Sequence, residues 1–236
     1  MTDHFLLKNV SIYYNVYKTA KDKSIKNTIF NQIGGNIFKK NKHEFVRALD
    51  NISISIKSGD RIGLVGPNGS GKSTFLKLLA GCIEPLEGRI IRNGKINSIL
   101  SLGMGLDSEL TGIENIKLQG HFRNYTKSKR RDFLDKVISF SELENFINMP
   151  VESYSSGMTL RLAFAIATYE IPQILLLDEI INVGDKDFAE KSKRKIEALI
   201  NTSQVLILAS HNEGVIKNYC NTIFQFDKGS LKVKKI

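Results

Sequence analysis

The stretch from Gly66 to Thr74 carries the clearest chemistry in the sequence. It reads GPNGSGKST, a glycine followed by four residues and then Gly-Lys-Ser, with the members Gly66, Pro67, Asn68, Gly69, Ser70, Gly71, Lys72, Ser73 and Thr74. In such a loop the glycines let backbone N–H groups face phosphates, Lys72 reaches the β- and γ-phosphates, and Ser73 ligates Mg²⁺. The pattern predicts a phosphate-binding loop for a nucleotide; the alternative is a glycine-rich turn without a ligand.

Three more polar side chains follow apolar, strand-like runs. QILLLDE (173–179) ends in Asp178 and Glu179, and LILASHN (206–212) contains His211. Because ligands of α/β folds bind beyond the carboxyl ends of the strands, all three are expected at one edge of a sheet. Asp178 would hold Mg²⁺ directly or through water, and Glu179 would polarise an attacking water. For His211 the sequence leaves two roles open, a structural one and contact with the γ-phosphate.

The segment YSSGM (154–158) precedes a helical pattern, TLRLAFAIATYE. Ser155 suits a helix cap, but a glycine in the first turn costs about 1 kcal/mol relative to alanine, which capping does not explain. Ser155 and Gly157 would present a hydroxyl and bare N–H groups, which together form a second anion site. We interpret it as serving the nucleotide of another copy, in a head-to-tail dimer.

Several elements must position these residues. Strand-like runs occur at 6–14, 49–57, 61–66, 88–100, 173–178, 204–210 and 222–226, with a helix from Lys72 to about Ala80. Between about 101 and 157 the patterns are helical, including KSKRRDFLDKVISF and SELENFI. Strands that alternate with helices predict an α/β core with a largely parallel sheet, and the helical stretch predicts a second lobe.

Residues 15–47 are expected to form a further insertion. They carry eight Lys or Arg residues, and Ile25, Ile29, Ile33 and Ile37 recur every four positions, as on one face of an irregular helix that kinks or ends at Gly34-Gly35. The basic residues fit either a solvated surface or a position near anionic lipid head groups or a membrane partner.

Composition limits the classes of function. The chain has 236 residues, 42% of them hydrophobic, which suits one folded domain with a sub-lobe. Its apolar runs are too short to span a membrane, and its start lacks the plan of a signal peptide, so we expect it in the cytosol. Cys82 and Cys220 have no metal-ligand spacing and are expected to pack in the interior. The net charge of +10 favours a phosphate-rich partner but does not choose among nucleic acid, a bilayer surface and other anions.

Taken together, these motifs resemble those of the ATP-binding cassette (ABC) family. GPNGSGKST matches its Walker A motif, ILLLDE its Walker B motif with the adjacent glutamate, and YSSGM its signature motif. NVGD (182–185) stands where its D-loop lies, and His211 matches its switch histidine. The resemblance implies an α/β fold: a RecA-like P-loop ATPase core (about 1–100 and 160–236) with a β-rich subdomain and an inserted helical lobe (about 101–159).

The resemblance also implies roles for single residues. Tyr14 would stack on adenine, with Tyr17 as a substitute, although Tyr14 is equally an aromatic at a strand end. Asp185 would line the seam of a dimer in which two copies share their ATP sites. At the position where most members carry a magnesium-sensing glutamine, this chain has Ser101, whose side chain is too short to reach as glutamine does.

More narrowly, the sequence is similar to the ATPases of bacterial polysaccharide exporters. The features are YSSGMTLRLAFAIAT, LGMGLDSELTGIENI (102–116), DEIINVGDKDF (178–188) and the insertion between the first strands. The resemblance implies a MgATP-hydrolysing homodimer on the cytoplasmic face of the bacterial inner membrane, beneath a separate permease for a lipid-linked glycan. It also implies the shorter type, without a C-terminal carbohydrate-binding domain. The alternatives are an ABC ATPase for another transporter and a soluble ABC protein acting on ribosomes or DNA. The single cassette and the absence of heptads argue against the second alternative, so we expect no nucleic-acid partner.

Overall fold

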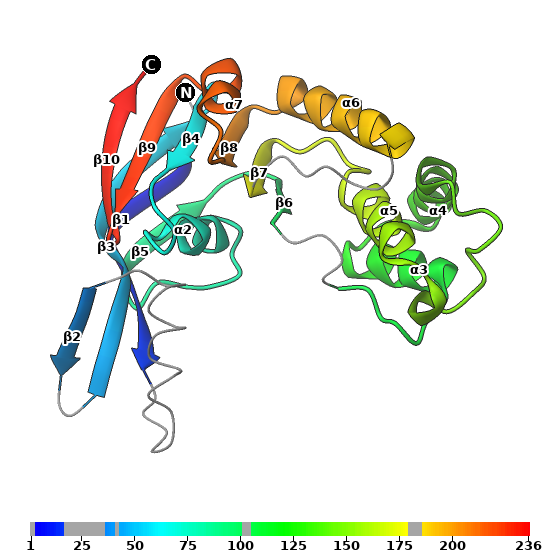
Figure 1. Ribbon diagram of the computed structural model, residues 1–236, viewed down its shortest axis with the longest axis horizontal. Helices are drawn as coiled ribbons and strands as arrows, with labels where there is room; N and C mark the ends of the chain where they lie inside the picture. Colours follow the sequence, from blue (N-terminus) through cyan, green and yellow to red (C-terminus); the bar gives the residue numbers. More distant parts are fainter. Residues whose placement is uncertain (1–2, 17–35, 41–42, 101–104, 179–185) are drawn as a thin grey trace. The chain divides into compact units, whose positions relative to one another are not determined.

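The computed structural model describes residues 3–16, 36–40, 43–100, 105–178 and 186–236 (Figure 1). The chain divides into two compact units. The first comprises residues 1–98, 173–180 and 203–236, and the second comprises residues 99–172 and 181–202. The expected helical lobe ended near residue 159, whereas the second unit also includes the rest of the helix that follows YSSGM and a later helix.

A six-stranded sheet forms the centre of the first unit. Its strand order is β10-β9-β4-β8-β7-β6. The members are β4 (Arg61–Val65), β6 (Ile96–Ile99), β7 (Ile174–Asp178), β8 (Val205–Ala209), β9 (Thr222–Asp227) and β10 (Ser230–Lys235). β4 pairs with β8 and β9, and β7 pairs with β8, all in parallel, while β10 is antiparallel to β9. The predicted α/β class with a largely parallel sheet is therefore confirmed.

A four-stranded antiparallel sheet, in the order β2-β3-β1-β5, completes the strands of this unit. It contains β1 (Asp3–Val16), β2 (Asn36–Lys40), β3 (His43–Lys57) and β5 (Glu87–Arg92). The long strands β1 and β3 pair from Asp3↔Lys57 to Val16↔Glu44. In this register the two strands bury alternating apolar side chains, among them Phe5, Leu7 and Ile56.

Helices α2 (Lys72–Leu79) and α7 (Glu213–Tyr219) pack on the six-stranded sheet. Phe75 of α2 meets the rings of Phe224 and Phe226 at centroid distances of 6.2 and 5.2 Å. On β4, a Cβ added at Gly63 would lie 2.7 Å from the side chain of Ile216 in α7, so this glycine allows α7 to approach closely. Helix α2 therefore packs against β9, and α7 packs against β4, the strand that leads into the phosphate loop.

The second unit is helical. It contains α3 (Gly112–Phe122), α4 (Lys127–Ser141), the short 3₁₀ helix η1 (Val151–Ser153), α5 (Ser156–Ala167) and α6 (Lys186–Thr202). Its core includes Ile116 of α3, Phe133 and Val137 of α4, and Leu162 of α5. Thr111 and Glu114 form a capping box at the start of α3, and Thr126 caps α4.

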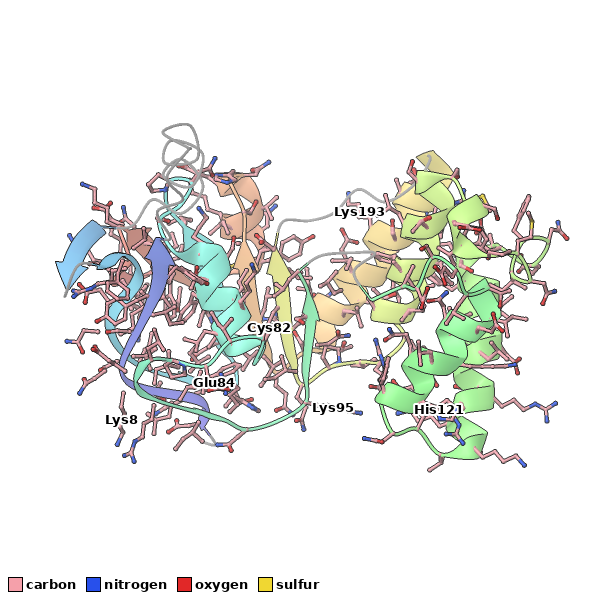
Figure 2. The ribbon with its side chains drawn as sticks, turned by 90° about the horizontal axis from the view of Figure 1, so that it is seen from below. Lys8, Cys82, Glu84, Lys95, His121 and Lys193 are labelled. Atoms are coloured by element: carbon pink, nitrogen blue, oxygen red, sulfur yellow. The ribbon has the colours of Figure 1, made fainter. Side chains whose placement is uncertain are left out.

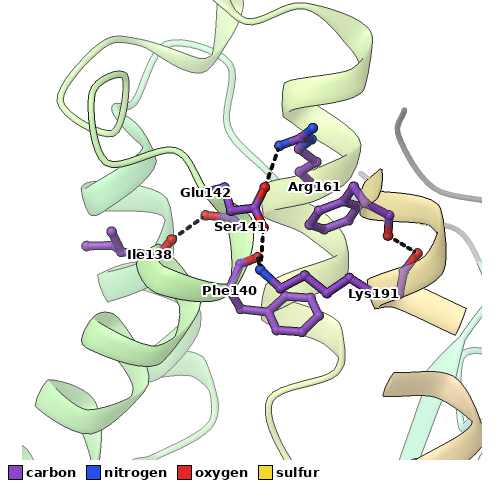
Figure 3. A network of polar contacts seen from close by, with 8 residues as sticks. Ile138, Phe140, Ser141, Glu142, Arg161 and Lys191 are labelled. Atoms are coloured by element: carbon purple, nitrogen blue, oxygen red, sulfur yellow. Dashed lines mark hydrogen bonds and ion pairs between the residues drawn. The ribbon is translucent and has the colours of Figure 1, made fainter. Parts of the chain in front are cut away.

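Glu142 joins three of these helices (Figure 3). Its carboxylate accepts hydrogen bonds from Arg161 of α5 at 3.2 Å and from Lys191 of α6 at 2.6 Å. The Arg161 guanidinium also lies over the Phe188 ring of α6, 4.9 Å from its centroid. These contacts explain why α6 groups with the helical unit, although Glu142 and Lys191 are 49 positions apart in the sequence.

Three expectations from the sequence need correction, and two further elements were not expected. SELENFI (141–147) does not form a helix, because α4 ends at Ser141 and Glu142 adopts a left-handed conformation with φ 58°. Ile37 lies in strand β2 rather than on a helix, while the other members of that four-residue repeat lie outside the described residues. Cys82 is exposed and only Cys220 is buried. Helix α7 and strand β10 were not anticipated.

Candidate functional site

The phosphate loop connects β4 to α2, as its sequence predicts. Gly66 and Gly71 have φ values of 145° and 114°, in the region that favours glycine. An added Cβ would lie 2.3 Å from the Phe226 carbonyl oxygen at Gly66 and 2.5 Å from the Ala48 carbonyl oxygen at Gly71. Both glycines are therefore required by the backbone conformation and by the neighbouring strands, β9 and β3.

Lys72 begins helix α2 and is buried, with 8% of its surface exposed. Its ammonium donates hydrogen bonds to the carbonyls of Gly66 and Pro67, at 2.7 and 3.0 Å. The lysine is thereby folded over its own loop, where backbone oxygens stabilise its charge. A buried ammonium at the first residue of a helix creates a strongly positive environment for an anion.

The turn between β9 and β10 holds the loop from a second side. The backbone N–H of Gly229 donates to the Ser70 carbonyl at 2.9 Å, and the Gly229 carbonyl accepts from the Asp50 N–H at 3.0 Å. The Ser70 hydroxyl is buried and has no hydrogen-bond partner among the described residues. An orphaned buried hydroxyl inside a glycine-rich loop is a feature that a bound polar ligand would explain.

Asp178 and His211 follow neighbouring strands, as expected. The register pairs Asp178 at the end of β7 with Ala209 at the end of β8, and Ala209 also pairs with Leu64 of β4. The loop after β4, the carboxylate of β7 and the histidine after β8 therefore lie at the same edge of the sheet. The Ser73 hydroxyl donates to Asp178 Oδ2 at 3.4 Å, so the two predicted magnesium ligands face each other. His211 is exposed.

The two adjacent tyrosines of β1 differ in their environment. Tyr13 donates a hydrogen bond to Glu87 at 2.9 Å and lies 5.3 Å beneath the Arg47 guanidinium. Tyr14 is half-buried and pairs in register with Val46, two residues before the Ala48 carbonyl that touches the phosphate loop. The Tyr13 hydroxyl is hydrogen-bonded, whereas the Tyr14 hydroxyl has no hydrogen-bond partner among the described residues.

The signature segment forms the start of α5 in the second unit. Ser155 is the N-cap and accepts a hydrogen bond from the Met158 N–H at 3.2 Å. Tyr154 is buried beneath this turn, where its hydroxyl donates to the Phe146 carbonyl at 2.9 Å and burial raises its pKa. A Cβ added at Gly157 would meet only the Ser155 hydroxyl oxygen, at 3.9 Å. Packing within this unit therefore does not require a glycine at this position.

Four of the candidate site residues lie outside the described residues: Tyr17, Ser101, Glu179 and Asp185. Sequence reasoning also missed residues that support the site. The Gly229 N–H holds the phosphate loop, and the carbonyls of Ala48 and Phe226 leave no room for side chains at Gly71 and Gly66; these are backbone atoms, which leave no signal in side-chain patterns. Glu142, the residue that joins α5 to α6, was misplaced in an expected helix.

The described helices include none that is long and apolar enough to cross a membrane. A strand, a glycine-rich loop and a helix that opens with lysine and serine, next to a carboxylate at the same sheet edge, define a P-loop nucleotide-binding protein.

Comparison with known proteins narrows this class. The family model described as ABC transporter matches residues 49–182, and the chain belongs to this family. Its fold is the ABC nucleotide-binding domain, and it is an ABC-type ATPase. The dimeric structure of an ATP-binding cassette bound to ADP and Pi superposes with a TM-score of 0.67, covering 98% of each chain at 23% identity.

Two curated relatives are similar over nearly the whole sequence. The O-antigen export system ATP-binding protein RfbE of Yersinia enterocolitica is 39% identical over 95% of this chain and 94% of its own length. The teichoic acids export ATP-binding protein TagH of Staphylococcus haemolyticus is 37% identical over 96% of this chain and 82% of its own length.

Proposed function

We propose that this chain is the MgATP-hydrolysing subunit of an exporter that moves a lipid-linked polysaccharide across the cytoplasmic membrane through a separate permease. The observation that carries the proposal is the near full-length similarity to two export ATP-binding proteins, one for O-antigen and one for teichoic acids. Their named cargoes are both cell-surface glycopolymers, although the relatives come from different bacteria. The substrate class is therefore an O-antigen, capsular or teichoic-acid-like polymer.

The phosphate loop fits MgATP. Lys72, the backbone N–H groups of the loop and the start of α2 offer positive charge and donors to the phosphates. Ser73 and Asp178 already face each other at 3.4 Å, and their hydroxyl and carboxylate oxygens are ligands suited to Mg²⁺. When bound, Mg²⁺ would neutralise charge on the phosphate oxygens. Tyr14 is assigned to the adenine ring.

A second copy would complete the site. Ser155 and the N–H groups of the first turn of α5 would contact the γ-phosphate held by the partner's loop, with Asp185 at the seam. Exposed Ser155 and the open space around Gly157 support this arrangement, because the turn leaves room for an approaching group. Contacts to γ-phosphate that exist only in the closed dimer give ATP the differential affinity that shifts a conformational equilibrium.

Hydrolysis is assigned to two residues at the sheet edge. Glu179, which follows Asp178 directly, would act as general base on the attacking water, and His211 would contact the γ-phosphate. Glu179→Gln removes the base but keeps the size of the side chain. We expect this variant to bind ATP and remain a closed dimer in size-exclusion chromatography, while the unmutated protein returns to monomers. Hydrolysis by Glu179→Gln at the unmutated rate would refute the assignment.

The export role is tested in the host cell. We expect depletion of the protein, or its replacement by Glu179→Gln, to cause one lipid-linked glycan to accumulate on the inner face of the membrane and to disappear from the cell surface. Fractionation should place the protein at the cytoplasmic face of the membrane only when its permease is present, and nuclease treatment should leave this association unchanged. Normal surface glycan without accumulation would assign the same ATPase to a transporter for another substrate.

A further inference from the structure

The second unit contains a cavity of about 450 Å³ that the proposed ATPase chemistry does not use. It lies where α4, the end of α5 and α6 meet. Its lining residues are Asp135, Lys136, Val137, Ser139, Phe140, Ala165, Thr168, Tyr169, Lys191 and Lys195. The volume falls within the range of about 300–1,000 Å³ that is usual for small-molecule sites.

The residues that line the cavity include more lysines than acids. Three lysines, Lys136, Lys191 and Lys195, face it together with one acid, Asp135. Lys191 is neutralised within the fold, because it donates to Glu142 at 2.6 Å and to the Phe140 carbonyl at 3.0 Å (Figure 3). Lys136 pairs with an acid on its own helix, Asp132, at 3.0 Å.

Lys195 differs from its two neighbours. Among the described residues no hydrogen bond or ion pair reaches its ammonium, which lies 6.0 Å from the centroid of the Phe140 ring. Burial and the nearby charge of Lys136 lower its pKa, which shows that the surroundings disfavour the protonated form. An anion in the cavity would remove this disadvantage by supplying the missing counter-charge.

The rest of the lining combines apolar side chains with the hydroxyls of Ser139, Thr168 and Tyr169. Phe140 and Tyr169 contribute aromatic rings, and Val137 and Ala165 are buried apolar residues of the lining. The Tyr169 hydroxyl donates to Asp132 at 2.6 Å, which fixes the orientation of its ring. The hydroxyl of Thr168 is already used, because it donates to the Phe164 carbonyl at 2.8 Å. The cavity thus offers apolar surface together with positive charge.

We propose that this cavity binds a small organic anion, a phosphate or carboxylate carried on an apolar group, with the anion at Lys195 and Lys136 and the apolar group against Phe140 and Tyr169. A charge-assisted hydrogen bond to Lys195 would hold the head group, and burial of the apolar part would add affinity. The proposal concerns binding in the helical unit and does not rest on the proposed function.

Phenyl phosphate and benzoate serve as probes, with inorganic phosphate and phenol as controls for charge alone and for the ring alone. Binding is followed by the ¹³C-methyl NMR signal of Ala165 in the cavity, with the methyl signals of Leu76 in α2 reporting any binding at the phosphate loop. Excess MgADP is present throughout. We expect one or both ring-bearing anions to shift the Ala165 signal at lower concentration than either control compound, and the stronger probe identifies the head group.

Substitutions at two lysines of α6 test whether the probe binds in the cavity or is attracted non-specifically by the basic surface of this helix. Lys195→Met should weaken probe binding by about tenfold or more, since it removes a charged donor but keeps the length of the side chain. Lys195→Arg should retain part of the binding. Lys193→Met is the matched control, because Lys193 is exposed on the same helix and does not line the cavity (Figure 2).

Three results would overturn the proposal. The first is no Ala165 shift with either ring-bearing anion. The second is equal weakening by Lys195→Met and Lys193→Met, which would indicate non-specific attraction to α6. The third is binding of phenol as tight as that of phenyl phosphate, which would show that the lysines only cover apolar surface with their stems.

Discussion

Replacing Gly157 by alanine should separate the stability of the protein from its activity. The added Cβ would meet only the Ser155 hydroxyl oxygen at 3.9 Å, an ordinary contact distance, and the backbone of Gly157 is not in the left-handed region. Alanine in place of a helical glycine should therefore raise the free energy of unfolding by about 0.5–1 kcal/mol. For a chain of this size that corresponds to an increase in Tm of about 1–4 °C.

The same methyl group should impair ATP hydrolysis. If the γ-phosphate of a partner's ATP approaches this turn, the methyl displaces it, and a misplacement of about 1 Å can cost about 100-fold in rate. Steady-state phosphate release, measured beside thermal unfolding, checks both expectations. An unchanged rate would refute the close approach that we infer for this turn.

Gly112→Ala is the control for the predicted effect of Gly157→Ala on the free energy of unfolding. Gly112 also stands in the first turn of a helix in the same unit, but its added Cβ would lie 2.5 Å from the Tyr154 hydroxyl oxygen and 2.7 Å from Ile147. The Tyr154 hydroxyl cannot easily move, because it is hydrogen-bonded to the Phe146 carbonyl. We expect a loss of about 1–3 kcal/mol from overpacking. Equal destabilisation by Gly112→Ala and Gly157→Ala would mean that Gly157 is structural.

Two further predictions concern the helical unit. Glu142→Gln should lower the free energy of unfolding by about 1 kcal/mol, a modest loss because the carboxylate is partly exposed, whereas Glu144→Gln on the neighbouring surface should have no effect in the same thermal scan. The hydrogen bonds of the capping box with Thr111 lower the pKa of Glu114 below its ordinary value of 4.5. The ionised Glu114 therefore contributes to stability above pH 4.5, and this contribution is lost as the pH falls through the lowered pKa. Glu114→Gln should remove this acid-dependent loss in unfolding curves measured between neutral and acidic pH, and an unchanged pH profile would contradict the assignment.

The sequence was sufficient to predict the elements that carry nucleotide chemistry. The strand before Gly66, the helix from Lys72 and the apolar strands that end near Asp178 and His211 all have local patterns, and parallel strands place their carboxyl ends together. The facing of Ser73 and Asp178 follows from this topology. Such features are predictable because each depends on a short segment and on one general rule of α/β folds.

Contacts between distant backbone atoms could not be predicted. The turn at Gly229 holds the phosphate loop, and the carbonyls of Ala48 and Phe226 lie where side chains at Gly71 and Gly66 would be, yet none of these backbone positions can be read from a side-chain pattern. The end of α4 was missed for a related reason. Glu142 adopts a left-handed conformation, which the pattern SELENFI does not reveal, since its ion pairs come from helices far along the chain.

The glycines of GPNGSGKST and of YSSGM therefore differ in how strongly they indicate a bound group. Gly66 and Gly71 have positive φ and would clash with β9 and β3 if they carried a Cβ, so the fold alone accounts for them, whatever the loop binds. Gly157 has neither constraint, and alanine would stabilise its helix. A glycine that the fold does not need, beside an exposed capping serine, supports our proposal that a group from another subunit approaches this turn. For this chain the physical argument for a shared site is thus stronger at the signature turn than at the glycines of the phosphate loop.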